Sequence, residues 1–288
     1  MARAAAKTGA MPAVIVAIEQ RFPKDQRIIA DDLAYAMLPS GMKAFVWLMR
    51  PAFARDWMVR ATEKSAPGLW ALMACRKRYI DEKLIEAVDE IDAVVNLGAG
   101  FDTRVYRLPA LADLPAWEID QPENIAPKRL RLGKLFGAIP PSRQPRADRF
   151  RPAGLGCCAD SVRLLRGQAH VFYLGRRHAI LDARRPRRDV RISGKGRARQ
   201  PPDLHPRTQG FPPRKGDAWR RGRLQKLRRE GVWLFGMEPD RVEPFLDPFG
   251  WRVIEHIGYQ ELVDRYVRPT GRELASTPVE RMVYAEKL

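Results

Sequence analysis

The sequence predicts an α/β protein in which a helical N-terminal region precedes a sheet of mostly parallel strands. Three observations carry this prediction. Apolar residues recur at helical spacing through residues 1–90, a short β-branched run ends in a glycine turn at residues 92–100, and two β-rich runs lie within residues 231–288. The chain has 288 residues, which is enough to bury a sizeable core.

Residues 1–90 are predicted to form a helical cap. A final helix near residues 68–88 should dock its apolar face on a core. An earlier stretch with the same three- and four-residue spacing places Asp31 and Asp32 on its polar side; its apolar positions are Ile28, Ile29, Leu33, Ala36 and Met37. The tryptophans of this region are expected to pack in the core or within the cap: Trp47, Trp57 and Trp70.

The motif with a chemical meaning begins at residue 92. The apolar run of residues 92–97 stops at Gly98, and Gly100 follows before an apolar pattern resumes at Val105. This order is typical of a strand, a glycine turn and a helix start. Glycines let the backbone approach a ligand closely, and a helix N-terminus offers unpaired N–H groups to a phosphate or carboxylate.

A second strand is predicted at residues 116–120, and it ends in Asp120, twenty residues after Gly100. An acid at this place accepts hydrogen bonds from ribose hydroxyls. Thr103 stands where a dinucleotide-binding motif has its third glycine, so a ligand with a carboxylate and a ribose, such as S-adenosylmethionine, suits the pattern better. The plainer alternative is a glycine turn beside a solvent-exposed Asp120.

The run VVNLGAGFDTRVYRL, followed by WEIDQPENIAPKR and preceded by RKRYIDEKL, resembles the S-adenosylmethionine-dependent methyltransferases related to leucine carboxyl methyltransferase. Residues 13–38 and 231–288 also resemble this family, so about two thirds of the chain is covered. The resemblance implies a Rossmann-like class I methyltransferase sheet with a helical N-terminal cap. It implies cofactor contacts from Gly98, Gly100 and Asp120, a carboxylate contact from Arg76, and a weaker candidate in Glu118.

Residues 141–229 differ in kind from both flanks. They hold 25 Lys and Arg against 6 Asp and Glu, a net charge of +19, whereas the whole chain carries +18. A GC-rich gene read one base out of register produces such an Arg- and Pro-rich composition. Back-translation with a one-base shift permits AVNLVPIDFD from residues 141–152, and family-like runs from residues 169–182 and 192–214. We therefore predict two compensating frame changes, near residues 141 and 230, with the central strands disrupted and the segment disordered.

Arginine clusters such as Arg184–Arg188 would also bind phosphate backbones non-specifically. The second hypothesis is therefore a basic, partly disordered nucleic-acid-binding protein, although neither stacking aromatics nor a recognition helix accompanies the charge. The cysteines and histidines of the segment lack zinc-site spacing, so no metal site is predicted.

The four predicted segments are the cap (1–90), the first half of the cofactor-binding domain (91–140), the basic segment (141–230) and the C-terminal strands (231–288). The stretch of residues 41–59 is too interrupted by charges for a membrane span, and no membrane partner is expected. With no clear cleavage site near the start and reduced cysteines, the predicted location is cytoplasmic. The predicted activity is O-methylation of a carboxylate or hydroxyl on a small-molecule acceptor, with no catalytic residue assigned and with loss of activity if the central strands are replaced.

Overall fold

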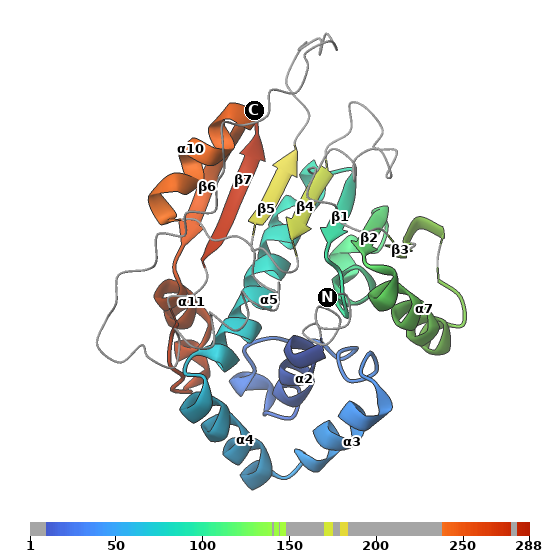
Figure 1. The fold of residues 1–288 in the computed structure, drawn as a ribbon, viewed down its shortest axis with the longest axis vertical. Helices are drawn as coiled ribbons and strands as arrows, with labels where there is room; N and C mark the ends of the chain where they lie inside the picture. The colour runs from blue at the N-terminus through green and yellow to red at the C-terminus, as the bar shows by residue number, and fades with distance from the viewer. Residues whose placement is uncertain are drawn as a thin grey trace.

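The structure is a computed structural model that describes residues 10–139, 141–143, 145–147, 170–174, 179–183, 238–277 and 281–288. Figure 1 shows a helical cap below one end of a sheet, with a long helix, α5, running from the cap up along the sheet. The α-helices are α2 (Ala10–Glu19), α3 (Ser40–Leu48), α4 (Ala52–Ser65), α5 (Leu69–Ala87), α6 (Arg104–Arg107), α7 (Pro122–Phe136), α10 (Val242–Leu246) and α11 (Tyr259–Tyr266).

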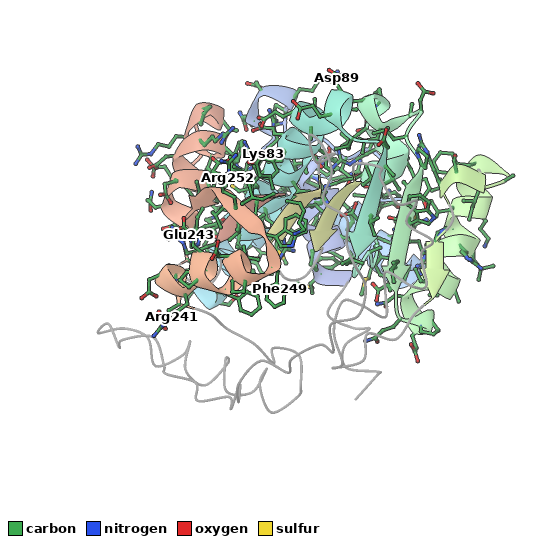
Figure 2. The ribbon with its side chains drawn as sticks, turned by 90° about the horizontal axis from the view of Figure 1, so that it is seen from above. Lys83, Asp89, Arg241, Glu243, Phe249 and Arg252 are labelled. Carbon is green, nitrogen blue, oxygen red and sulfur yellow. The ribbon has the colours of Figure 1, made fainter. Side chains whose placement is uncertain are left out.

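The strands of the described residues form one sheet in the order β3-β2-β1-β4-β5-β7-β6. They are β1 (Ala93–Leu97), β2 (Ala116–Asp120), β3 (Pro145–Ala147), β4 (His170–Leu174), β5 (Ala179–Ala183), β6 (Trp251–Ile257) and β7 (Met282–Lys287). Strands β1, β2, β3, β4 and β6 share one direction, and β5 and β7 run against them. Figure 2 shows α7 at one end of the sheet and α10 with β6 at the other. The α/β class predicted from the sequence is therefore confirmed.

The expected antiparallel pair near the C-terminus is present as β6 and β7. β5 departs from the expected arrangement, because it pairs antiparallel with β4 and parallel with β7. Only four residues separate β4 from β5. A parallel neighbour needs a crossover of a dozen residues or more, so a connection this short imposes the antiparallel direction.

Three short strands lie inside the segment predicted to be disordered. β3, β4 and β5 belong to it, so residues 145–147, 170–174 and 179–183 are described as strands of the sheet. The disorder of the segment as a whole stays a prediction. The sequences of β4 and β5, HVFYL and AILDA, are apolar runs of strand length, which explains their place in the centre of a sheet. Most of the basic segment, including its arginine clusters, lies outside the described residues.

The cap contains one clear departure from the predicted helices. Residues 28–37 form turns instead of a helix. The side chains of Glu19 and Gln20 accept the backbone N–H groups of Ile28 and Asp31 at 2.8 and 3.0 Å, and Gln20 donates to the carbonyl of Ile29 at 3.0 Å. Because side chains satisfy these backbone groups, the segment needs no helical ladder to be buried.

The main core joins the cap to the sheet through α5. It includes residues of α2, α5, β1, α11 and β7, so the cap is packed directly on the sheet-side elements. Trp70 is fully buried and donates its indole N–H to Glu19 at 2.8 Å, which confirms its predicted core role. The same prediction is wrong for Trp47 and Trp57, whose side chains are exposed on α3 and α4. Among the helices of the described residues, none is long and apolar enough to cross a membrane.

Candidate functional site

The glycine turn lies at the carboxyl end of β1. Gly98 and Gly100 have positive φ angles of 76° and 46°, which explains why glycine occupies both positions. β1 pairs with β2 on one side and with β4 on the other, so the strand order reverses its direction at the β1–β4 boundary. In open α/β sheets the crevice at this reversal, outside the carboxyl ends of the strands, is where ligands bind. Figure 1 shows that this end of β1 points toward the cap.

Asp120 ends β2 and lies directly beside the turn. Its Oδ2 atom accepts the backbone N–H of Gly100 at 2.6 Å, and its Oδ1 atom accepts from Gln121 N and Asn124 Nδ2 at 2.6 and 2.9 Å. A carboxylate oxygen has two acceptor positions, so Oδ1 is filled and Oδ2 keeps one. The neighbouring Gln121 Oε1 is also buried, with no hydrogen-bond partner among the described residues. The end of β2 thus presents two acceptors suited to a pair of ligand hydroxyls.

The helix N-terminus that the sequence suggested as an anion site is not available for that role. α6 is a single turn of four residues, and the N–H of Arg104 is bonded to Asp102 Oδ1 at 2.9 Å. Within the turn, the N–H groups of Gly98 and Ala99 donate to the carbonyl of Ile119. Because these N–H groups already have partners within the protein, they are not free to bind an anion. The glycines of the turn instead let a ligand come close to the backbone.

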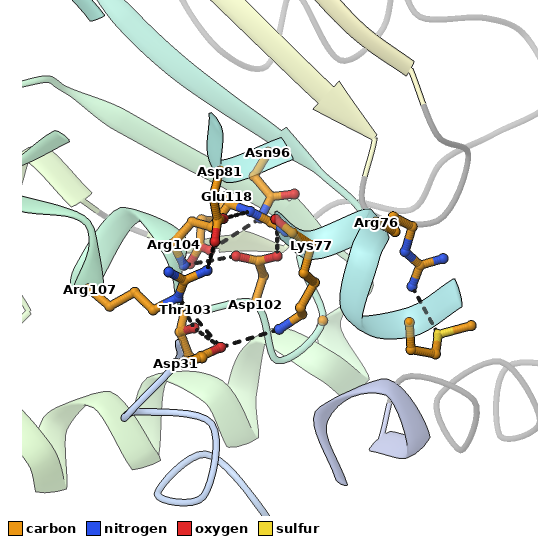
Figure 3. A network of polar contacts seen from close by, with 12 residues as sticks. Asp31, Arg76, Lys77, Asp81, Asn96, Asp102, Thr103, Arg104, Arg107 and Glu118 are labelled. Carbon is orange, nitrogen blue, oxygen red and sulfur yellow. Dashed lines mark hydrogen bonds and ion pairs between the residues drawn. The ribbon is translucent and has the colours of Figure 1, made fainter. Parts of the chain in front are cut away.

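Ion pairs beneath the turn hold it to α5 (Figure 3). Arg104 is buried and bonds Asp81 Oδ1 through Nε at 2.6 Å and Asp102 Oδ2 through Nη1. Arg107 reaches the other oxygen of Asp81 at 2.5 Å. Burial alone would raise the pKa of Asp102, but Arg104, with Lys77 and Lys128, outweighs it and holds that pKa well below its ordinary value.

Asp31 brings the cap into the same network. It lies in the turn segment after α2, is almost fully buried, and its Oδ2 atom accepts the Thr103 hydroxyl at 2.7 Å. Lys77 and Arg107 lie 3.4 and 3.5 Å from that oxygen. The prediction that Asp31 lies on a polar, outward side is therefore wrong. The network contains equal numbers of cations and carboxylates, so its buried charge is balanced. Its three cations are Lys77, Arg104 and Arg107, and its three carboxylates are Asp31, Asp81 and Asp102.

Glu118 points into the protein rather than toward the crevice. Its side chain is fully buried, accepts Lys128 Nζ at 2.6 Å and accepts the Tyr106 hydroxyl at 2.8 Å. Burial raises the pKa of this carboxyl, and the Lys128 ammonium opposes part of that rise. Both oxygens of Glu118 have partners inside the fold, which favours Asp120 over this weaker sequence candidate as the acid of the site.

Arg76 comes from the middle of α5 and lies apart from the turn. It is 7% exposed, and its Nη2 atom contacts the sulfur of Met73, one helical turn earlier, at 3.3 Å. Figure 3 shows its guanidinium directed away from the Arg104 cluster. The structure therefore brings Gly98, Gly100 and Asp120 together and leaves Arg76 buried on α5, apart from them.

Two cavities lie beside residues 272–274 rather than at the turn. One is lined only by residues 260–275, and the other lies between the cap and this C-terminal segment. Their volumes are about 320 and 310 Å³, and Arg272, Glu273 and Leu274 line both. In the described part of the chain, no group of three or more His, Cys, Asp or Glu side chains is placed to hold a metal ion. The acceptors beside the glycine turn suit a ligand that carries hydroxyl groups.

Comparisons with known proteins point to one family. The sequence model of the family described as leucine carboxyl methyltransferase matches residues 9–165, which is more than half of the chain. A protein of Mycobacterium avium (strain 104) named "Putative S-adenosyl-L-methionine-dependent methyltransferase" is 32% identical over 139 residues, 47% of this chain and 45% of that protein. A protein of the same name from Mycobacterium ulcerans (strain Agy99) is 31% identical over the same shares. The aligned part thus spans under half the length of these relatives.

Proposed function

This chain belongs to the leucine carboxyl methyltransferase family, and from that membership we propose that it binds S-adenosyl-L-methionine and transfers the methyl group to a small-molecule acceptor. The observation that carries the proposal is the 2.6 Å hydrogen bond between Gly100 N–H and Asp120 Oδ2. It joins the glycine turn after β1 to the acid at the end of β2, beside the point where the strand order reverses.

The residues at this edge suit the ribose of the cofactor. A ribose presents two hydroxyl donors, and the remaining acceptor position of Asp120 Oδ2 and the unpartnered Gln121 Oε1 are consecutive acceptors at the end of β2. Gly98 and Gly100 carry no side chain that would keep a ligand away from the backbone. Arg76, with a planar donor fork, is the proposed partner of the cofactor carboxylate.

The chemistry of the reaction requires little from the protein beyond alignment. The cofactor supplies an activated methyl group on a sulfonium, whose sulfur is a good leaving group. The protein holds the acceptor in line with the methyl carbon and excludes water, and the cap is placed to do both because it covers the carboxyl end of β1 (Figure 1). An ionised carboxylate acceptor needs no general base, so no catalytic side chain is assigned. The acceptor class, a carboxylate or hydroxyl, rests on the family relationship.

A binding experiment tests the cofactor proposal. Calorimetric titration of the purified chain with S-adenosyl-L-methionine should give saturable binding, and Asp120→Asn should weaken it roughly tenfold to a hundredfold, because hydrogen bonds to charged groups contribute about 1.5–3 kcal/mol. Asp113→Asn, an exposed carboxylate in the loop before β2, is the matched control. Unaltered affinity in a folded Asp120→Asn variant, or no binding by a folded parent chain, would contradict the proposal.

We also propose that residues of about 141–230 arose from a shifted reading frame in the coding sequence. The support is the confinement of the +19 charge to residues 141–229. The family match extends to residue 165, into the first part of this segment. Resequencing the codons for residues 135–235 decides the matter. A base gained or lost near each end would restore a family-like segment. If the nucleotide sequence is unchanged, the frame changes would have to have arisen by decay of the gene itself.

A further inference from the structure

Large apolar side chains are exposed together on the two outer helices of the cap. We call this set the aromatic patch, and its members come from α3, the start of α4 and no other element: Phe45, Trp47, Leu48, Phe53 and Trp57. The exposed fractions of Trp47, Phe53 and Trp57 are 53%, 76% and 61%. Large apolar side chains exposed on neighbouring helices mark an interaction site more often than single scattered ones do.

Helical spacing places pairs of patch residues on a shared face of each helix, whereas Trp47, two residues after Phe45, projects from a different side of α3. Phe53 and Trp57 are four residues apart on α4, so their side chains lie on the same face. Phe45 and Leu48 are three apart on α3 and share a face in the same way. Figure 1 shows α3 and α4 meeting at the outer end of the cap, away from the sheet.

The charges around the patch are mostly positive. Residues 40–65 contain five basic and two acidic side chains, a net charge of +3. The basic residues Arg50, Arg60 and Lys64 are exposed. Asp56 is paired with Arg55 at 3.0 Å.

Glu63, the second acid of the two helices, is turned inward. It accepts the backbone N–H groups of Gly68 and Ala275 at 3.2 and 3.0 Å. The solvent-facing side of α3 and α4 therefore combines aromatic rings with cations whose carboxylate neighbours are already occupied.

We propose that the aromatic patch docks on the surface of an anionic lipid bilayer, with its rings at the headgroup level. Tryptophan and phenylalanine beside lysine and arginine are the composition of helices that lie in a membrane interface. The exposed cations would face lipid phosphates, each contributing through the negative surface potential. Such contact needs no spanning helix, which agrees with the lack of one among the described helices.

The charge argues against a second copy of this chain as the occupant. A two-fold symmetric dimer through this face would place the same patch, with the same net charge of +3, opposite itself. Like charges brought together at an interface repel, whereas an anionic bilayer neutralises them.

Vesicle flotation of the full chain tests the proposal. The parent chain should float with vesicles of phosphatidylcholine and phosphatidylglycerol, and the double change Phe53→Ser with Trp57→Ser should reduce partitioning about tenfold or more, because it removes two rings from the buried apolar area. The matched control is Phe245→Ser with Phe249→Ser, two exposed rings in and directly after α10, which should leave flotation unchanged. Equal flotation of all three proteins would overturn the proposal.

A second measurement separates insertion of the patch from electrostatic attraction of the basic segment. Vesicles of the same composition with brominated acyl chains should quench tryptophan fluorescence, and the quenching should drop in the variant with Trp47→Phe and Trp57→Phe, which keeps the patch apolar. If quenching is as strong in that variant as in the parent chain, other tryptophans contact the acyl chains, and the proposal is overturned. Concentration-dependent dimerisation without lipid, abolished by Phe53→Ser with Trp57→Ser, would instead identify a second copy as the occupant and overturn it too.

Discussion

The hydroxyl of Thr103 donates to Asp31 Oδ2 at 2.7 Å, across 72 residues of sequence, and so ties the cap to the turn beside β1. Asp31 is almost fully buried, and the cations beside its carboxylate are Lys77 and Arg107. The position of the glycine turn therefore depends on a side chain from the cap as well as on β1 itself.

Replacing Asp31 by Asn should destabilise the protein by about 3 kcal/mol, because removing one partner from a buried ionic network leaves the remaining charges uncompensated. The adjacent Asp32 is exposed, so Asp32→Asn should change the free energy of unfolding by less than about 0.5 kcal/mol. Urea unfolding followed by circular dichroism gives both values. Similar stabilities for the two variants would show that the Asp31 contacts contribute little.

Gly100→Ala should weaken S-adenosyl-L-methionine binding more than it weakens the fold. An added Cβ would lie 3.8 Å from Asp120 Oδ2, an ordinary contact, so the folded protein loses only the backbone strain of φ +46°, about 1–2 kcal/mol. Gly271→Ala also places a side chain at a positive φ, +69°, and its Cβ meets no atom within 4 Å, so it serves as the control. Calorimetry should show reduced affinity for Gly100→Ala alone. Equal affinities of the two variants would show that Gly100 does not lie against the ligand.

The stability of the protein should fall in acid, partly through Asp102. The unfolded carboxyl has its ordinary pKa of 3.8, whereas the folded carboxyl stays ionised to lower pH. The unfolded state therefore binds more protons as the pH falls, so the stabilisation present above pH 3.8 is lost below it. Asp102→Asn removes this contribution.

Denaturant unfolding of the parent chain and Asp102→Asn between about pH 5 and about pH 3 checks the sign, because the linkage predicts a smaller loss for the variant. Asp113→Asn, an exposed acid, should follow the parent curve. A variant curve as steep as the parent curve would mean that other carboxyls account for the acid sensitivity.

Lys128→Met should cost about 3–5 kcal/mol, because it leaves the fully buried Glu118 carboxylate without its counter-charge. Adding Glu118→Gln to that variant should recover a large part of the loss, since the double change removes both charges. Lys134→Met, on the exposed side of the same helix, is the control. Thermal unfolding of the parent, Lys128→Met, Glu118→Gln and the double variant measures the coupling, and additive losses would argue against a direct pair.

The glycine turn and Asp120 could be predicted because their signals are local. A β-branched run, two glycines and a second strand ending in acid are visible within thirty residues, and the structure brings Gly98, Gly100 and Asp120 together as expected. The role of Asp31 could not be seen in this way. Periodicity placed it on a polar face, and only the folded chain brings it to Thr103.

Exposure of Trp47 and Trp57 was missed for a related reason. Periodicity identifies an apolar face on a helix but not whether a neighbour covers it, and a large aromatic residue favours burial on average. Trp70 obeys the average, whereas Trp47 and Trp57 lie on helices at the outer end of the cap. The direction of β5 depends on a four-residue connection inside a segment whose composition gave no reason to expect strands.

The reversal of β5 determines which edge of the sheet its end reaches. Ala183, the last residue of β5, pairs with His170, the first residue of β4, and so lies at the edge where β1 begins. That edge is roughly 16 Å from the glycine turn, the length of a five-residue strand. Residues grafted directly after β5 would remodel the face of the protein remote from the cap, whereas grafts after β1, β2 or β4 would remodel the ligand edge.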